Sequence, residues 1–183
     1  MSLNVIVIAG PNGAGKTTAA PGLLRDLLGV VEFVNADAIA RGLSGFRPEG
    51  AALAAGRILL TRLKTLAREG RDFAFETTLA AKSFAPWLTG LRENGYAVHL
   101  IFLWLPNPEA AMARVQDRVR RGGHDIPEAT IRRRYVSGLR HFFSLYMPLT
   151  SSWRFSDNSG TGGPRPIARG AGSVVQTVFD PQT

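Results

Sequence analysis

The 183-residue chain contains no cysteine, which excludes disulfide bridges and metal sites built on thiolates. Lysine is scarce as well: only Lys16, Lys64 and Lys82 occur, so arginine carries most of a net charge of +8. The apolar run over residues 3–9 is far too short to cross a bilayer, and no basic segment precedes it. We therefore expect a cytoplasmic protein without a membrane partner.

The arginine excess favours an anionic partner, because the guanidinium group makes forked contacts with phosphate oxygens. Two kinds of partner fit this charge, a nucleic acid or a small polyanion such as a nucleotide. Nucleic-acid surfaces usually add exposed aromatic residues among the basic ones, whereas most aromatic residues here lie within apolar runs. The composition therefore favours an anionic partner without naming one.

Short β-branched runs alternate with longer helical patterns, which predicts a three-layer α/β fold around a mainly parallel, five-stranded sheet. We expect strands over residues 5–9, 31–35, 72–76, 96–105 and 152–156. Helices are expected over 15–28, 48–69, 83–94, 106–121 and 127–147. Residues 160–180 change character and predict a loop followed by a small β-hairpin that protects an edge. No repeat or second domain is visible, so we expect a single domain over residues 1–183.

One segment matches the P-loop pattern G-x-x-x-x-G-K-[ST] in full, between a buried strand and a helix. Its backbone N–H groups are expected to surround the phosphates of ATP. Lys16 would bridge the β- and γ-phosphates, Thr17 would ligate Mg²⁺, and Thr18 would contact the α-phosphate. The alternative is a glycine-rich turn with a solvated lysine. The predicted nucleotide ligands are Gly10, Pro11, Asn12, Gly13, Ala14, Gly15, Lys16, Thr17 and Thr18.

Asp37 comes just past the second predicted strand, at the carboxyl edge where parallel sheets bind ligands. A carboxylate there can orient an attacking hydroxyl and accept its proton. The alternative is a structural role as the N-cap of a short helix that begins at Ala38.

Glu76 ends the third predicted strand and so lies at the same edge. Many P-loop proteins place at this point a carboxylate that holds Mg²⁺ through water. By this position alone, Glu76 would serve the metal. The alternative is that Thr77 and Thr78 only satisfy the loop backbone while Glu76 is exposed.

A lid is predicted over residues 114–134, because two arginine-bearing helices flank Gly122-Gly123. Arg114, Arg118 and Arg121 form one stripe on the first helix. We predict that Arg118, Arg121 and Arg134 contact the transferring phosphate and so take part in catalysis. The alternative is a solvated basic face. On the second helix, Arg132 should have a partner and Arg133 should point away, and His124 is either a substrate contact or solvated.

Four segments in this order resemble the zeta toxin family of P-loop kinases: residues 10–18, 34–40, 75–79 and 118–135. The resemblance implies an ATP- and Mg²⁺-dependent kinase in which Asp37 is the catalytic base and contacts the acceptor with Glu76 and Thr78. It also implies a small acceptor such as a UDP-N-acetyl sugar, and an antitoxin protein as partner. In related nucleotide kinases the loop at 157–160 flanks the adenine through its backbone; a plain turn is the alternative.

A function of another class also fits the sequence. The basic face could act on the phosphate backbone of nucleic acid, in a nucleotide-dependent ATPase or binding protein. Such a protein would not need Asp37 near the γ-phosphate.

Overall fold

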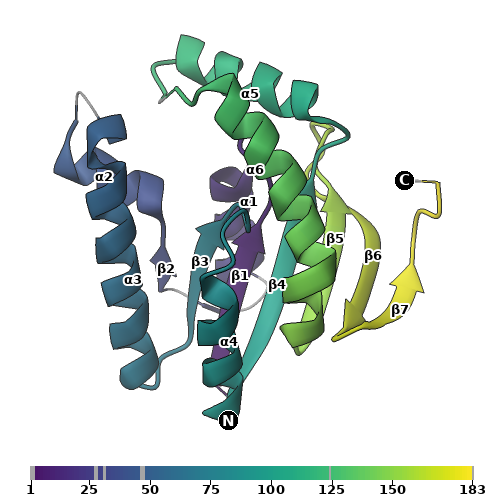
Figure 1. Ribbon diagram of the computed structural model, residues 1–183. Coiled ribbons are helices and arrows are strands. Elements are labelled where there is room, and N and C mark those ends of the chain that lie inside the picture. Colours follow the sequence, from purple (N-terminus) through teal and green to yellow (C-terminus); the bar gives the residue numbers. More distant parts are fainter. Residues whose placement is uncertain (1–2, 27–28, 31, 46–47, 124, 183) are drawn as a thin grey trace.

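A computed structural model describes residues 3–26, 29–30, 32–45, 48–123 and 125–182. Its strands form one sheet in the order β2-β3-β1-β4-β5-β6-β7, drawn in Figure 1. The strands are β1 (Leu3–Ala9), β2 (Phe33–Val34), β3 (Phe73–Thr77), β4 (Tyr96–Trp104), β5 (Ser152–Asp157), β6 (Arg165–Ala171) and β7 (Val174–Val178). The first five strands run parallel, as predicted.

Helices connect the parallel strands. They are α1 (Lys16–Pro21), α2 (Ala36–Leu43), α3 (Ala52–Arg68), α4 (Phe84–Glu93), α5 (Pro108–Arg120) and α6 (Glu128–His141). A π-helical turn (Gly22–Asp26) follows α1, and a 3₁₀ turn (Pro48–Ala51) precedes α3. A π-helical turn (Phe142–Tyr146) and a 3₁₀ turn (Met147–Leu149) follow α6. Among the described residues, no helix is long and apolar enough to cross a membrane.

The helices cover both faces of the sheet, which confirms the three-layer prediction. On one face α3, α4 and the turn after α6 pack on alternate residues of β1, such as Val5 and Val7. On the other face α1, α5 and the first half of α6 pack on Ile6 and Ile8. Because both faces are covered, β1 is apolar throughout its second half.

The prediction of a five-stranded sheet is wrong, because the C-terminal hairpin extends the sheet to seven strands. β6 pairs antiparallel with β5, and β7 pairs antiparallel with β6. A short connection after β5 permits only an antiparallel return, which places β6 on the open edge of β5. The hairpin therefore moves the edge outward without protecting it, since Val175 and Val178 on β7 are more than half exposed.

Two predicted elements are shorter than expected. The helix over 15–28 is α1 plus a π-helical turn, interrupted near Pro21, whose ring lacks an N–H to continue the ladder. The second strand is only Phe33–Val34, and Leu27, Leu28 and Val31 lie outside the described residues.

The loop after β3 is held by α6. Leu79 is fully buried with a φ of +54°, and its carbonyl oxygen accepts a hydrogen bond from His141 Nδ1 at 2.9 Å. The Tyr146 hydroxyl donates to the carbonyl of Ala81 at 2.5 Å, and burial raises the pKa of Tyr146 to about 12. A Cβ atom at Gly138 would lie 2.2 Å from the carbonyl oxygen of Thr78, so α6 approaches this loop through a glycine.

This close approach predicts that Gly138→Ala destabilises the protein by about 1–3 kcal/mol, because the added methyl group must push α6 off the loop. Chemical denaturation at equilibrium measures the change. Gly90→Ala in α4 is the matched control, since a Cβ there meets nothing within 4 Å. That control should be neutral or stabilising by about 0.5–1 kcal/mol. Equal effects of the two variants would refute the packing argument.

At the opposite end of the sheet, a polar ladder crosses β1, β4 and β5. His99 Nε2 donates to Asn4 Oδ1 at 3.1 Å, and the Ser152 hydroxyl donates to His99 Nδ1 at 2.7 Å. Asn4 Nδ2 in turn donates to Asp72 at 3.2 Å. This donor pattern is that of a neutral imidazole. Burial lowers the pKa of His99 below its usual value, an effect that Asp72 partly offsets.

Because the pKa of His99 is lower in the folded protein, the unfolded chain takes up a proton first as the pH falls. His99 therefore adds to the free energy of unfolding above the usual histidine pKa, and this contribution is lost toward acid pH. The difference in Tm between wild type and His99→Gln should therefore be more positive near pH 7.5 than near pH 5. Thermal melts at both pH values measure it, and the other histidines cancel in the difference. A difference that grows toward acid pH would contradict this account.

Candidate active site

The P-loop leaves the carboxyl end of β1 through a turn that requires glycine. Gly10, Gly13 and Gly15 have φ values of +142°, +78° and +77°. A Cβ at Gly10 would lie 2.3 Å from the carbonyl oxygen of Leu103 on β4, so no other residue fits there. The loop is compact: Ala14 is fully buried, and its N–H donates to the carbonyl of Pro11 at 3.2 Å.

Lys16 folds back over this loop. Its Nζ donates to the carbonyl oxygens of Gly10 at 3.0 Å and Pro11 at 2.9 Å. Burial lowers the pKa of Lys16, and the nearby carboxylates of Glu76 and Asp37 oppose that shift. The ammonium group therefore lies at the mouth of the loop beside two carboxylates.

Thr17 links the P-loop to β2 and β3. Its hydroxyl donates to Glu76 Oε2 at 3.0 Å and accepts a hydrogen bond from Asn35 Nδ2 at 3.3 Å. Register explains the meeting, because Ala9 at the end of β1 lies beside Thr77 of β3, next to Glu76. Burial raises the pKa of Glu76, and Lys16 and the Thr17 hydrogen bond oppose the rise. Thr18, the next residue of α1, is exposed.

Asp37 stands in the first turn of α2 and does not cap it. Asn35 is the N-cap, and its Oδ1 accepts from the N–H of Ala38 at 2.9 Å. The alternative assignment of Asp37 as the cap is therefore wrong, because the helix begins at Ala36. The Asp37 side chain is 54% exposed, and its Oδ2 lies 3.9 Å from Arg118 Nη1.

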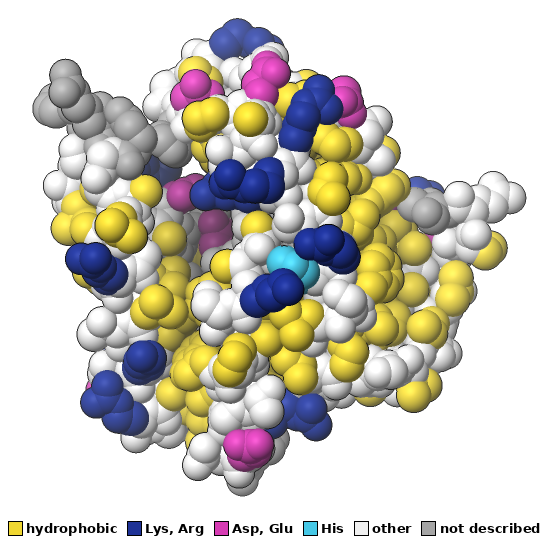
Figure 2. All heavy atoms as spheres, in the orientation of Figure 1, with side chains coloured by type: hydrophobic (Ala, Val, Ile, Leu, Met, Phe, Trp, Pro, Cys, Tyr) yellow, Lys and Arg dark blue, Asp and Glu magenta, His cyan; other side chains and the backbone are white. Residues whose placement is uncertain are grey.

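Arg134 of α6 belongs to the same group. Burial lowers the pKa of Arg134, Arg133 adds to the lowering, and the charge of Asp37 opposes it. Figure 2 shows acidic side chains in a hollow and basic side chains along its rim beside the α5–α6 hairpin. Lys16, Asp37, Glu76, Arg118 and Arg134 thus form one charged cluster at the carboxyl edge of the sheet.

No described contact joins the other predicted site residues of the lid and of the loop after β3 to this cluster. Arg121 is exposed one residue past α5, and none of its described interactions joins it to Asp37 or Glu76. Thr78 accepts a hydrogen bond from the N–H of Ala80 at 3.5 Å, as the structural alternative for this threonine expected. His124 lies outside the described residues.

The arginines of the lid differ in the groups that they contact. Arg132 pairs with Glu109 at 2.6 Å and Arg133 is exposed, as predicted for both. Arg114 was expected to share a stripe with Arg118, but it turns toward the loop after β5. Its Nη atoms donate to the carbonyl oxygens of Asn158 at 2.8 Å and Ser159 at 2.5 Å.

Sequence reasoning missed two contributors, Asn35 and Asn158. Asn158 is buried and its Nδ2 donates to the carbonyl of Ala14 at 2.7 Å, which ties the loop after β5 to the P-loop. The signal for Asn35 was its place two residues before Asp37 at a helix start. Nothing local distinguished Asn158 from a residue of an ordinary turn.

Comparison with solved structures identifies the fold. A chain of the PezAT chromosomal toxin–antitoxin system of Streptococcus pneumoniae matches with a TM-score of 0.66 at 16% identity, covering 92% of this chain and 72% of that one. A complex of AvrRxo1-ORF1 and AvrRxo1-ORF2 with ATP matches with a TM-score of 0.68 at 17% identity, covering 98% of this chain and 61% of that one. Shikimate kinase from Acinetobacter baumannii, in complex with shikimate, matches with a TM-score of 0.50 at 23% identity, covering 82% of each chain. The fold is therefore that of P-loop kinases.

Comparison of sequences identifies the family. An uncharacterised protein of Haemophilus influenzae is 30% identical over 135 residues, which are 74% of this chain and 94% of that protein. The sequence pattern of the AAA domain matches residues 5–135, from β1 through the P-loop and the lid to α6. Because this match spans most of the chain, the protein belongs to the AAA domain family of P-loop proteins.

Proposed function

We propose that this protein is an ATP-dependent kinase that transfers the γ-phosphate of ATP·Mg²⁺ to a hydroxyl group of a small acceptor in the cytoplasm. The observation that carries the proposal is the position of Asp37. Because Asn35 is the N-cap of α2, the Asp37 carboxylate does not cap the helix. It lies beside Arg118, next to the P-loop lysine. A protein that only bound nucleotide would have no use for a carboxylate held there.

The residues at this edge suit ATP and Mg²⁺. The three glycines with positive φ let the loop backbone bend around a phosphate, and Lys16 now rests on carbonyl oxygens that a phosphate could replace. The Thr17 hydroxyl keeps a second lone pair beyond the one that Asn35 uses, and Glu76 lies directly beside it. Thr17 and Glu76 would hold Mg²⁺, which offsets charge on the phosphates as the phosphoryl group moves.

The chain's own residues would then divide the work of transfer. Lys16 would contact the β- and γ-phosphates. Asp37 would orient the acceptor hydroxyl and take its proton as the new P–O bond forms. Arg118 and Arg134, from the two helices of the lid, would neutralise charge on the transferring group and help to exclude water.

The acceptor is proposed from the resemblance to the zeta toxin family, to which the fold match with the PezAT chain adds support. That family suggests a UDP-N-acetyl sugar as acceptor, with Glu76 and Asp37 near its hydroxyl groups. It also suggests an antitoxin protein as partner. Another structural neighbour is a shikimate kinase in complex with shikimate, and this supports a small acceptor.

Incubation with γ-labelled ATP·Mg²⁺ and a panel of UDP-N-acetyl sugars, nucleosides, shikimate and short oligonucleotides tests the proposal directly. We expect label on a small acceptor, because the cluster lies at the mouth of the P-loop with Asp37 exposed to an incoming hydroxyl. Lys16→Ala should abolish the labelled product. Release of free phosphate alone, stimulated by oligonucleotides, would replace the kinase with the nucleic-acid ATPase.

Asp37→Asn tests the base separately. We expect kcat to fall by about 10²–10⁴-fold while ATP affinity changes by less than about threefold, because the amide cannot accept the hydroxyl proton. Steady-state kinetics and a direct nucleotide-binding assay measure the two quantities. Asp117→Asn is the matched control, an exposed carboxylate of α5 that pairs with Arg120. Full activity in Asp37→Asn would remove the assignment of the base.

A further inference from the structure

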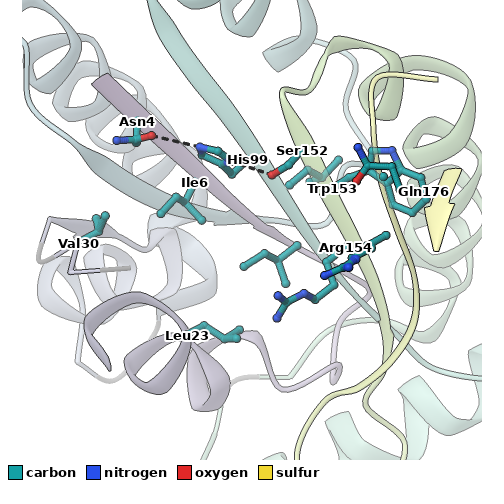
Figure 3. Close-up of a pocket in the computed structure, with 13 residues that line it drawn as sticks. Asn4, Ile6, Leu23, Val30, His99, Ser152, Trp153, Arg154 and Gln176 are labelled. Atoms are coloured by element: carbon teal, nitrogen blue, oxygen red, sulfur yellow. Dashed lines mark hydrogen bonds between the residues drawn. The ribbon is translucent and has the colours of Figure 1, made fainter. Parts of the chain in front are cut away.

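A cavity of about 620 Å³ opens at the end of the sheet away from the P-loop. It lies over the amino-terminal halves of β1, β4 and β5, on the face that α1 and α5 cover only farther up. Figure 3 shows Leu23 and Val30 on one side of it and Arg154 and Gln176 on the other. No residue of the P-loop lines this cavity, so it is separate from the nucleotide site. Its volume is ordinary for a small-molecule site.

Two arginines face each other in the wall of the cavity. Arg154 on β5 and Arg169 on β6 are cross-strand partners in the antiparallel pairing, so both side chains project from the same face of the sheet. Like charges placed directly opposite one another destabilise a sheet by roughly 0.2–1 kcal/mol. Both side chains are exposed, so water and salt screen part of this repulsion, and an anion bound between them would remove more of it.

Within the described part of the chain, neither guanidinium has a carboxylate partner. Arg165, on the same strand as Arg169, pairs with both Asp157 and Asp180. Arg154 and Arg169 make no such pair, and none of the described residues that line the cavity is Asp or Glu. No carboxylate among the described residues therefore pairs with the positive charge of this wall.

Two contacts with the β7 end of the hairpin hold Arg169 in place. Its Nε donates to the Thr177 hydroxyl at 3.3 Å, and its guanidinium carbon lies 5.7 Å from the ring centroid of Phe179. These two contacts restrict the rotamers of the side chain. The hydrogen bond to Thr177 uses Nε, so it does not involve the two Nη atoms of the guanidinium group. A side chain already ordered loses less entropy when it binds an anion.

The rest of the cavity is mixed in character. Ile6, Leu23 and Ile101 supply apolar surface, which would suit a ring or an aliphatic body. His99 and Ser152 on the floor are already hydrogen-bonded to each other. The charge that selects a ligand therefore comes from the arginine pair.

We propose that this cavity binds a small phosphomonoester, whose phosphate lies between Arg154 and Arg169 and whose organic part packs on the apolar side. A phosphomonoester dianion matches two guanidinium groups in charge and offers enough oxygens for both forks. This is a second ligand site at the opposite end of the sheet from the P-loop. It does not depend on the kinase proposal, because it involves none of the residues at the carboxyl edge.

Phenyl phosphate is the probe, and Lys16→Ala protein is the background, so that the P-loop does not contribute to the signal. Isothermal titration should detect binding of phenyl phosphate, weaker binding of inorganic phosphate, and none of phenol. Adding Arg154→Gln and Arg169→Gln should weaken the binding of phenyl phosphate at least about tenfold. The control adds Arg68→Gln and Arg92→Gln, two exposed arginines outside the cavity, and so removes the same charge.

Three outcomes would overturn the proposal: no binding of phenyl phosphate in the Lys16→Ala background, unchanged binding in the cavity variant, or an equal loss in the control. A melt supplies a second readout that does not need the ligand. Without phosphate, Arg154→Gln alone should raise Tm by about 1–3 °C, because it relieves the cross-strand repulsion. A fall in Tm would mean that Arg154 supports the fold, and the proposal would fail.

Discussion

The close approach of Gly10 to β4 is the constraint on which the site depends. β1 lies in the middle of the sheet, buried on both faces, and it can leave only by passing the carbonyl oxygen of Leu103, where a Cβ would lie 2.3 Å away. That exit directs the P-loop over the ends of β1 and β3 and carries Lys16 and Thr17 toward Glu76. Because β2 pairs with β3 in the same direction, its end carries Asn35 and Asp37 to the same edge. The exit at Gly10 and the parallel pairing of β1, β3 and β2 together gather side chains from three strand ends.

The charges gathered at that edge depend on one another. Burial alone would drive the Lys16 ammonium toward its neutral form and the Glu76 carboxylate toward its protonated form, and each of these groups opposes the shift of the other. Asp37 acts in the same sense on Lys16 and on Arg134. Since two carboxylates stand among three cations, the cluster keeps surplus positive charge toward the lid. A polyphosphate would supply the missing negative charge, which is why the arrangement favours a nucleotide over a purely structural ion-pair network.

The parts of the site that the sequence revealed are those set by position along a strand. The P-loop, Asp37 and Glu76 each follow directly from a recognisable strand end, and the structure brings all three together. The size of the sheet could not be read in this way, because whether β6 joins β5 or stands apart depends on pairing between segments separated by a loop. The assignment of Asp37 as a helix cap depended on locating the helix start within two residues, which is finer than periodicity allows. Arg114 was misplaced because a long side chain can leave its helical stripe for carbonyl oxygens on a distant loop.

The arginines behind the net charge of +8 therefore fall into groups according to the atoms that each one contacts. Arg114 donates to backbone carbonyl oxygens, and Arg132 and Arg165 pair with carboxylates. The charges of these three arginines therefore interact with other groups of the fold. Arg118 and Arg134 face Asp37 at the mouth of the P-loop. Arg154 and Arg169 are of a third kind: they are cross-strand partners, pair with no carboxylate of the described residues, and border a cavity of about 620 Å³. A count of basic residues points to an anionic partner without saying where it binds. The pattern of partners locates two separate anion sites at opposite ends of one sheet.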